Sequence, residues 1–177
     1  MRPDRLAGPA GAAVALGGVA AAIVRSPTFS WTTSALSDLG TAAETALLFN
    51  GGLVAGGVIA LGYAAALRRQ SISVAVGYAL SIAAMIFVGV FPSGTAPHFP
   101  VAVAFFLFST ATVALDGWQR RTVLVGRLAI AGAAVHLLGW VLWGVGIRPG
   151  PGLALPELGG VALFAGWVLF FAPPVST

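Results

Sequence analysis

The chain contains no cysteine and no lysine, and only 8% of its 177 residues are charged. The absence of cysteine excludes disulfides, thiolate nucleophiles and cysteine-ligated metals. Soluble globular domains have about 25% charged residues, so water cannot be the main solvent of this chain. Hydrophobic residues make up 58% of it. This composition is typical of a protein that lies within a membrane.

Apolar stretches divide the chain into six candidate transmembrane segments. Their lengths approach the roughly 20 residues that a helix needs to cross about 30 Å of hydrocarbon. The segments are Leu6 to Val24, Thr41 to Leu67, Ile72 to Phe91, Pro100 to Leu115, Val123 to Gly146, and Pro156 to Phe171. The fourth and sixth are short, at about 16 residues each. We therefore predict an all-α fold, a polytopic transmembrane bundle of six spans in which residues 1–177 form a single integral membrane domain.

The first segment allows a second interpretation, as a signal peptide. Arg2 and Arg5 precede it, and a run of three alanines at 20–22 lies near its end. The apolar part of a signal peptide usually has about 7 to 15 residues. The stretch 6–24 is longer than that, so we interpret it as a membrane span.

The nine basic residues are all arginine, and they are distributed unevenly between alternate loops. Seven lie at the amino terminus or in the second and fourth loops: Arg2, Arg5, Arg68, Arg69, Arg120, Arg121 and Arg127. The other loops contain only Arg25 and Arg148. Arginine-rich loops remain on the cytoplasmic side of a membrane. We therefore expect both termini in the cytoplasm of a multi-pass cell-membrane protein, with the loops 25–40, 92–99 and 147–155 facing outward.

Several acidic residues have simple structural interpretations. Thr41 and Glu44 have the spacing of a capping box at the start of the second span. Glu157 follows Pro156 in the first turn of the sixth span, where a carboxylate complements the helix dipole. Asp116 precedes Arg120 at the predicted cytoplasmic surface, and a solvated ion pair explains it.

Small residues recur at a spacing of about four in the first two spans. They are Gly11, Ala15, Gly18, Gly51, Gly52, Ala55 and Gly56. Such faces let helix backbones approach closely within a membrane. We expect close helix packing there, and the same faces can also join two copies of the chain in a homo-oligomer.

The polar residues of the outward loops suggest a binding site. Asp38 and His98 lie at the entrances of two spans on the same side, and Ser37, Asn50 and Glu44 lie near them in the sequence. We predict a polar cup on the outer face, centred on Asp38 and His98. The alternative is that both residues anchor their own loops by capping backbone groups.

His136 is the one ionisable residue predicted well inside the hydrocarbon. Such residues are expensive and usually face the bundle interior or a wet cavity. Trp140 and Trp143 continue its helix face towards the outer surface, so the three side chains can line a path for a ligand. A neutral histidine hydrogen-bonded between helices, with the two tryptophans in the interfacial aromatic belt, is the alternative interpretation.

No complete catalytic or cofactor motif is present. The chain has no phosphate-binding Walker sequence, no HExxH and no dinucleotide fingerprint. His98 and His136 with Asp38 or Glu44 would make a His/carboxylate metal site, and Ser34 or Ser37 with His98 and Asp38 would make a Ser-His-Asp arrangement, but neither has supporting spacing. We therefore expect no cofactor and no metal, and no nucleic-acid partner.

Four short motifs occur in order along the chain. They are Ser37-Asp38-Leu39-Gly40, Phe49-Asn50, Gly89-Val90-Phe91-Pro92 and His98. This order resembles domain-of-unknown-function family 998, and a more distant similarity links the serine-rich first outer loop to the Frag1/DRAM/PGAP2-type membrane proteins. The first resemblance implies a small polytopic protein and directs attention to Ser37, Asp38, Asn50, Pro92 and His98. It implies no reaction.

Three functions are compatible with these residues. The first requires the fewest special residues. It is a membrane protein that binds or handles a lipid or small apolar molecule in the outward cup, with membrane lipids as its partners. The second is an outward-facing lipid-modifying enzyme that uses Asp38 and His98 as acid and base. The third is a small ion or solute carrier in which His136 titrates.

Overall fold

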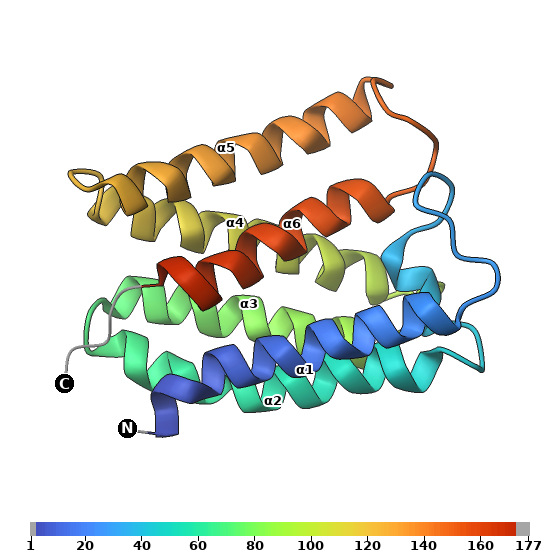
Figure 1. Cartoon of the computed structure of the whole chain (residues 1–177), viewed down its shortest axis with the longest axis horizontal. Helices are drawn as coiled ribbons and strands as arrows, with labels where there is room; N and C mark the ends of the chain where they lie inside the picture. The colour runs from blue at the N-terminus through green and yellow to red at the C-terminus, as the bar shows by residue number, and fades with distance from the viewer. Residues whose placement is uncertain (1–2, 173–177) are drawn as a thin grey trace.

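The computed structural model describes residues 3–172, and the regular structure in that range is helical throughout (Figure 1). The long helices are α1 (Pro3–Arg25), α2 (Ala46–Arg68), α3 (Ile72–Val90), α4 (His98–Gln119), α5 (Leu124–Gly144) and α6 (Ala154–Gly166). A 3-10 helix, η1 (Leu36–Gly40), precedes α2, and a π-helical turn, η2 (Trp167–Phe171), continues α6. Six segments, with α6 and η2 taken as one, are long and apolar enough to cross a membrane. The predicted all-α bundle of six spans is thus confirmed, and the chain is a multi-pass integral membrane protein.

The helices run back and forth, so the bundle has two ends (Figure 1). The segments 26–45, 91–97 and 145–153 connect helices at one end, which we call the η1 end. The turns that follow α2 and α4 lie at the opposite end, which we call the arginine end because Arg68, Arg69, Arg120 and Arg121 lie there. The cytoplasmic location of the arginine end stays a prediction from the charge distribution.

Most helices pack against the next helix in the chain. Contacts join α1 to α2, α2 to α3, α3 to α4, and α4 to α5. α6 then packs against α5 and α4, and η2 returns to α1 at the arginine end. α1 and α6 are not one of the closely packed pairs. The bundle therefore has one loosely closed side, between its first and last spans.

Glycines bring α1 and α2 into close contact. A Cβ atom added to Gly56 would lie 2.6 Å from the Gly11 carbonyl oxygen, and one added to Gly18 would lie 2.8 Å from Gly52 Cα. No larger residue fits without moving a backbone, so this part of the small-residue pattern packs the two helices as predicted. These glycines are covered within the chain. The expected homo-oligomer stays a prediction and would need another surface.

The fourth and sixth spans are longer than predicted. α4 has 22 residues, and the span formed by α6 and η2 has 18. The predicted fourth span ends at Leu115 because the charged Asp116 follows, whereas α4 continues to Gln119. Threonines within the span bond to their own helix: Thr110 donates to the Phe106 carbonyl and Thr112 to the Phe108 carbonyl, both at 2.7 Å. Such bonds allow an apolar helix to contain these residues.

The predicted capping box at Thr41 and Glu44 is wrong, because α2 begins at Ala46. The Thr41 hydroxyl donates to the Asp38 carbonyl at 2.8 Å, and the Thr45 hydroxyl donates to the Leu39 carbonyl at 2.6 Å. Both threonines therefore bond back to η1 rather than forward into a helix. Glu44 is exposed.

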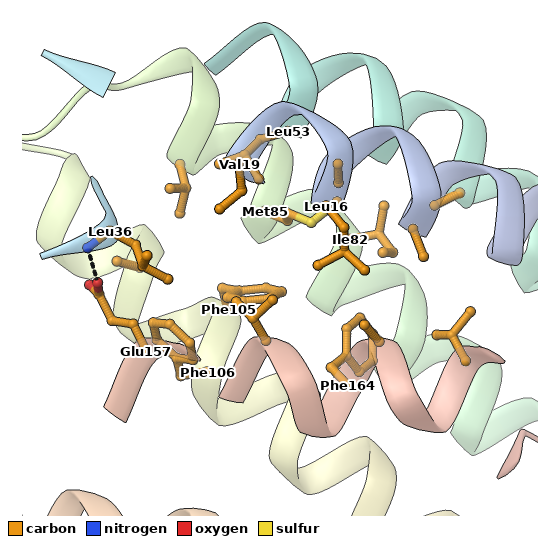
Figure 2. Close-up of a pocket in the computed structure, with 18 of the residues that line it drawn as sticks. Leu16, Val19, Leu36, Leu53, Ile82, Met85, Phe105, Phe106, Glu157 and Phe164 are labelled. Carbon is orange, nitrogen blue, oxygen red and sulfur yellow. Dashed lines mark hydrogen bonds between the residues drawn. The ribbon is translucent and has the colours of Figure 1, made fainter. Parts of the chain in front are cut away.

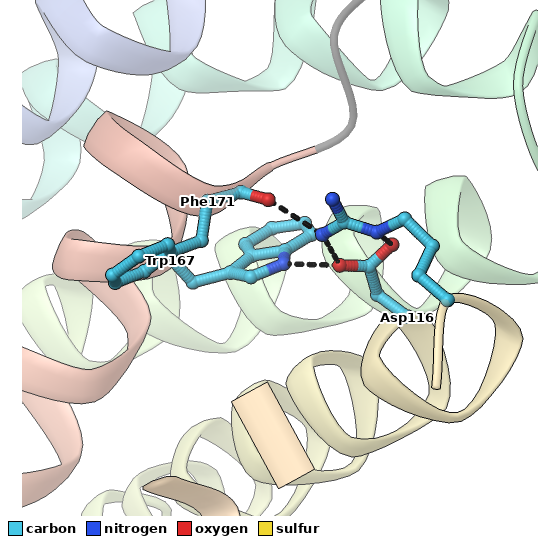
Figure 3. A network of polar contacts seen from close by, with 4 residues as sticks. Asp116, Trp167 and Phe171 are labelled. Carbon is cyan, nitrogen blue, oxygen red and sulfur yellow. Dashed lines mark hydrogen bonds and ion pairs between the residues drawn. The ribbon is translucent and has the colours of Figure 1, made fainter. Parts of the chain in front are cut away.

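A buried carboxylate joins α4 to η2 at the arginine end (Figure 3). Asp116 is only 1% exposed, so the prediction of a solvated ion pair is wrong. Its carboxylate pairs with the Arg120 guanidinium one helical turn later and accepts a hydrogen bond of 2.7 Å from Trp167 Nε1. Arg120 also donates to the Phe171 carbonyl. The network ties the end of α4 to η2, and burial was missed because Trp167 and Phe171 lie about fifty residues away in the sequence.

Candidate functional site

A cavity lies on the loosely closed side of the bundle, between α1 and α6 (Figure 2). We call it the α1/α6 cavity. It encloses about 860 Å³ of space not filled by atoms, including its open side. Leu16 and Val19 of α1 lie on one side of it, and Phe105 of α4 and Phe164 of α6 lie on the other (Figure 2).

Helix packing explains why the cavity forms here. At the η1 end, η1 contacts both α1 and α6, and at the arginine end η2 contacts α1. Between these two contacts α1 packs on α2, while α6 packs on α4 and α5. The two spans are thus held together at their ends and separated along their middle.

Aromatic rings form much of the wall opposite α1. The rings of Phe105 and Phe164 meet edge to face at 6.0 Å, and Phe105 and Phe106 do so at 5.0 Å. Tyr78 of α3 lies 5.7 Å from Phe164, and its hydroxyl donates to the Ala60 carbonyl at 3.1 Å. Tyr78 therefore lines the cavity with its ring, while its hydroxyl is already hydrogen-bonded. These contacts hold the wall in place independently of any ligand.

Polar side chains lie at the η1 end of the cavity. Glu157 Oε2 accepts a hydrogen bond of 2.6 Å from the Leu36 backbone N–H, and the glutamate is only 7% exposed. Ser37 is 9% exposed and also lines the cavity. The predicted position of Glu157 in the first turn of its helix is confirmed. Its hydrogen bond across to η1 was not predicted, since that partner is 121 residues away.

Backbone bonds position η1 over this end of the cavity. Gly152 N–H donates to the Thr32 carbonyl at 2.8 Å, and Ala154 N–H donates to the Ser34 carbonyl at 2.9 Å. A Cβ at position 152 would lie 2.5 Å from the Ser34 carbonyl oxygen, so this approach needs glycine. These bonds hold η1 beside the start of α6, where Leu36, Ser37 and Glu157 line the cavity.

The residues of the predicted polar cup bond to their own loops. Asp38 is exposed, and its Oδ2 accepts a hydrogen bond of 2.8 Å from Ala35 N–H, which caps η1. His98 Nδ1 lies 2.7 Å from the Phe91 carbonyl. Asn50 Nδ2 donates to the Gly40 carbonyl at 2.8 Å, and its buried Oδ1 has no partner among the described residues. Among residues 3–172, no hydrogen bond joins Asp38 to His98. Of the cup, only Ser37 lines the α1/α6 cavity.

His136 lies in a separate network between α4 and α5. Trp140 Nε1 can only donate, and it lies 2.9 Å from His136 Nε2, so that nitrogen accepts. Thr110 donates its hydroxyl proton to the Phe106 carbonyl and lies 2.7 Å from His136 Nδ1, so Nδ1 carries the proton. The histidine is thus a neutral tautomer with both nitrogens bonded. Trp143 bonds instead to the Gly152 carbonyl at 2.8 Å.

Sequence comparison identifies the family. A family model described as "Protein of unknown function (DUF998)" matches residues 9–173. The chain belongs to the DUF998 family. No curated protein and no solved structure shows significant similarity to it. This DUF998 protein also has no group of three or more histidine, aspartate or glutamate residues within residues 3–172 that could hold a metal ion.

The motifs on which the DUF998 resemblance rests are paired in the structure. Asn50 binds Gly40, the last residue of the Ser-Asp-Leu-Gly motif, and His98 contacts Phe91 of the Phe-Pro motif. A side chain on Gly40 would collide with Asn50. The motifs thus shape the loops of the η1 end. The apolar wall of the cavity carries no comparable sequence signal, because its phenylalanines resemble those that face lipid.

Proposed function

We propose that this DUF998 protein binds one chain of a lipid, or a similar apolar molecule, in the α1/α6 cavity. The observation that carries the proposal is a cavity between the first and last spans that is lined mostly by apolar side chains. The predicted outward cup at Asp38 and His98 is not the site in this proposal. The ligand lies deeper, within the bundle.

The chemistry of the walls supports an apolar ligand. Apolar cavities hold no ordered water, because water there finds no hydrogen-bond partners. Filling the space with hydrocarbon gains dispersion contacts that an empty space lacks. In a membrane the surrounding lipid chains are the most abundant molecules that can provide this contact.

The lining residues show how long the cavity is. The α1 residues that line it run from Gly8 to Val19, and those of α6 and η2 run from Glu157 to Val168. Eleven residues of helix rise about 16 Å, roughly half of the 30 Å hydrocarbon thickness. The cavity is therefore about as long as one leaflet is thick. It lies across the middle of the bundle, because its lining residues begin and end several residues inside both ends of α1 and of the span formed by α6 and η2.

Photolabelling of the purified protein with a diazirine-bearing dodecanol tests the proposal. Ala165 of α6 lines the cavity, whereas Ala162, on the same helix, is exposed and does not. Ala165→Phe fills the space and should lower labelling about tenfold, equivalent to 1.4 kcal/mol of binding free energy. Ala162→Phe adds the same side chain outside the cavity and should label like the wild type. Equal labelling of both variants would refute the proposal.

A further inference from the structure

The polar groups of the α1/α6 cavity are gathered at one end. Among the described residues that line it, Ser37, Tyr78 and Glu157 have polar side chains. The Tyr78 hydroxyl is bonded to the Ala60 carbonyl. The other two, Ser37 and Glu157, both lie where η1 meets α6. A ligand that fills the cavity has its chain along the aromatic wall and its head at this end.

Both groups have unused hydrogen-bonding capacity. The Ser37 hydroxyl makes no hydrogen bond within residues 3–172, although the residue is more than nine-tenths buried. The Glu157 carboxylate accepts from Leu36 N–H and lies beside the Ser37 backbone N–H. An ionised carboxylate has about four lone-pair sites, so acceptor positions remain. Figure 2 shows the glutamate at the cavity end beside Leu36.

Glu157 has no cationic partner in the described part of the chain. The ion pairs found there join Asp4 to Arg69 and Asp116 to Arg120. The charged side chain that acts on Glu157 is Asp38, which has the same sign. At this end, Arg25 is exposed and Arg148 lies over the Trp143 ring at 4.5 Å. Buried charges are normally paired, so this carboxylate lacks the counter-charge that a ligand can supply.

We propose that the α1/α6 cavity is selective for a single-chain amphiphile with an ammonium head, which donates hydrogen bonds to Glu157 and Ser37. This inference rests on the proposed function. An ammonium group has three donors and a positive charge, and both match what the end of the cavity offers. A hydroxyl head can donate one hydrogen bond but brings no charge. A carboxylate head meets like charge in a poorly solvated site and is rejected.

Competition between three dodecyl compounds tests the selectivity. Dodecylamine, dodecanol and dodecanoate have the same chain and differ only in the head. Each is titrated against photolabelling of the full-length protein by the diazirine-bearing dodecanol. We expect dodecylamine to displace the probe at about tenfold lower concentration than dodecanol, because a charge-assisted hydrogen bond is stronger than a neutral one. Dodecanoate should be the weakest competitor.

Two matched variants assign the effect to Glu157. Glu157→Gln keeps an oxygen that can accept from Leu36 N–H but removes the charge, so the advantage of dodecylamine should fall to that of dodecanol. Glu44→Gln removes an exposed carboxylate that does not line the cavity and should leave the order unchanged. A monodisperse elution profile and an unchanged unfolding midpoint show that each variant is folded.

The outcomes separate the two proposals. If all three compounds displace the probe equally, the cavity binds chains but the head selectivity is refuted. If dodecanol competes best, the site recognises a hydroxyl and the ammonium assignment is overturned. If neither competition nor the Ala165→Phe variant changes labelling, the proposed function itself fails.

Discussion

The two ends of the bundle each bury a carboxylate, but in opposite ways. At the arginine end Asp116 has a guanidinium, an indole N–H and a second helix around it, so its charge is balanced. At the η1 end Glu157 accepts hydrogen bonds from backbone amides, borders a cavity and has no cation beside it. A saturated, balanced carboxylate stabilises a fold. A carboxylate that keeps free acceptor positions and lies at the end of an apolar cavity can instead bind a ligand.

The largest expected loss of stability follows a substitution at the arginine end. Arg120→Ala should lower the free energy of unfolding by about 3 kcal/mol, because it leaves the buried Asp116 charge without its partner. Unfolding by a denaturing detergent titration measures this. Arg121→Ala is the control: Arg121 is exposed and lies over the Trp118 ring at 4.7 Å, so its loss should cost much less. Equal losses of unfolding free energy in the two variants would show that the Asp116 network does not stabilise the arginine end.

A smaller effect is expected from removing the other carboxylate. Glu157→Ala leaves the Leu36 N–H without its acceptor and should cost about 2 kcal/mol in the same titration, the penalty for a buried unsatisfied donor. Glu157→Gln should cost less, since the amide oxygen still accepts. If Glu157→Gln is as destabilising as Arg120→Ala, the charge of Glu157 is structural and the contrast between the ends disappears.

The smallest effect concerns the network around His136. Trp140→Phe removes one neutral hydrogen bond to Nε2 and should cost about 1 kcal/mol. Because neither residue lines the α1/α6 cavity, photolabelling should stay at the wild-type level. A strong loss of labelling with normal stability would instead return His136 and Trp140 to the binding site that the sequence suggested.

The helices were predictable because each needs only a local signal, a long apolar run between polar or proline-rich breaks. Boundaries failed where tertiary contacts decide them. Asp116 looked like a helix end because its partner Trp167 is distant in sequence, and Thr41 looked like a cap although its hydroxyl bonds back to η1.

The candidate site was predictable only in part. The sequence singles out Ser37 by its polarity, and it assigns Glu157 only a role in the first turn of its own helix. The cavity itself depends on the separation of α1 from α6, which are the first and last spans. No local pattern in the sequence specifies that separation, and Phe105 and Phe164 could equally face lipid.

A high-resolution structure of the protein in a lipid bilayer tests the central claim most directly. We predict a continuous tube of non-protein density in the α1/α6 cavity, starting beside Ser37 and Glu157 and extending towards Val168. A cavity closed by direct contact between α1 and α6, with no density between Leu16 and Phe164, would contradict it.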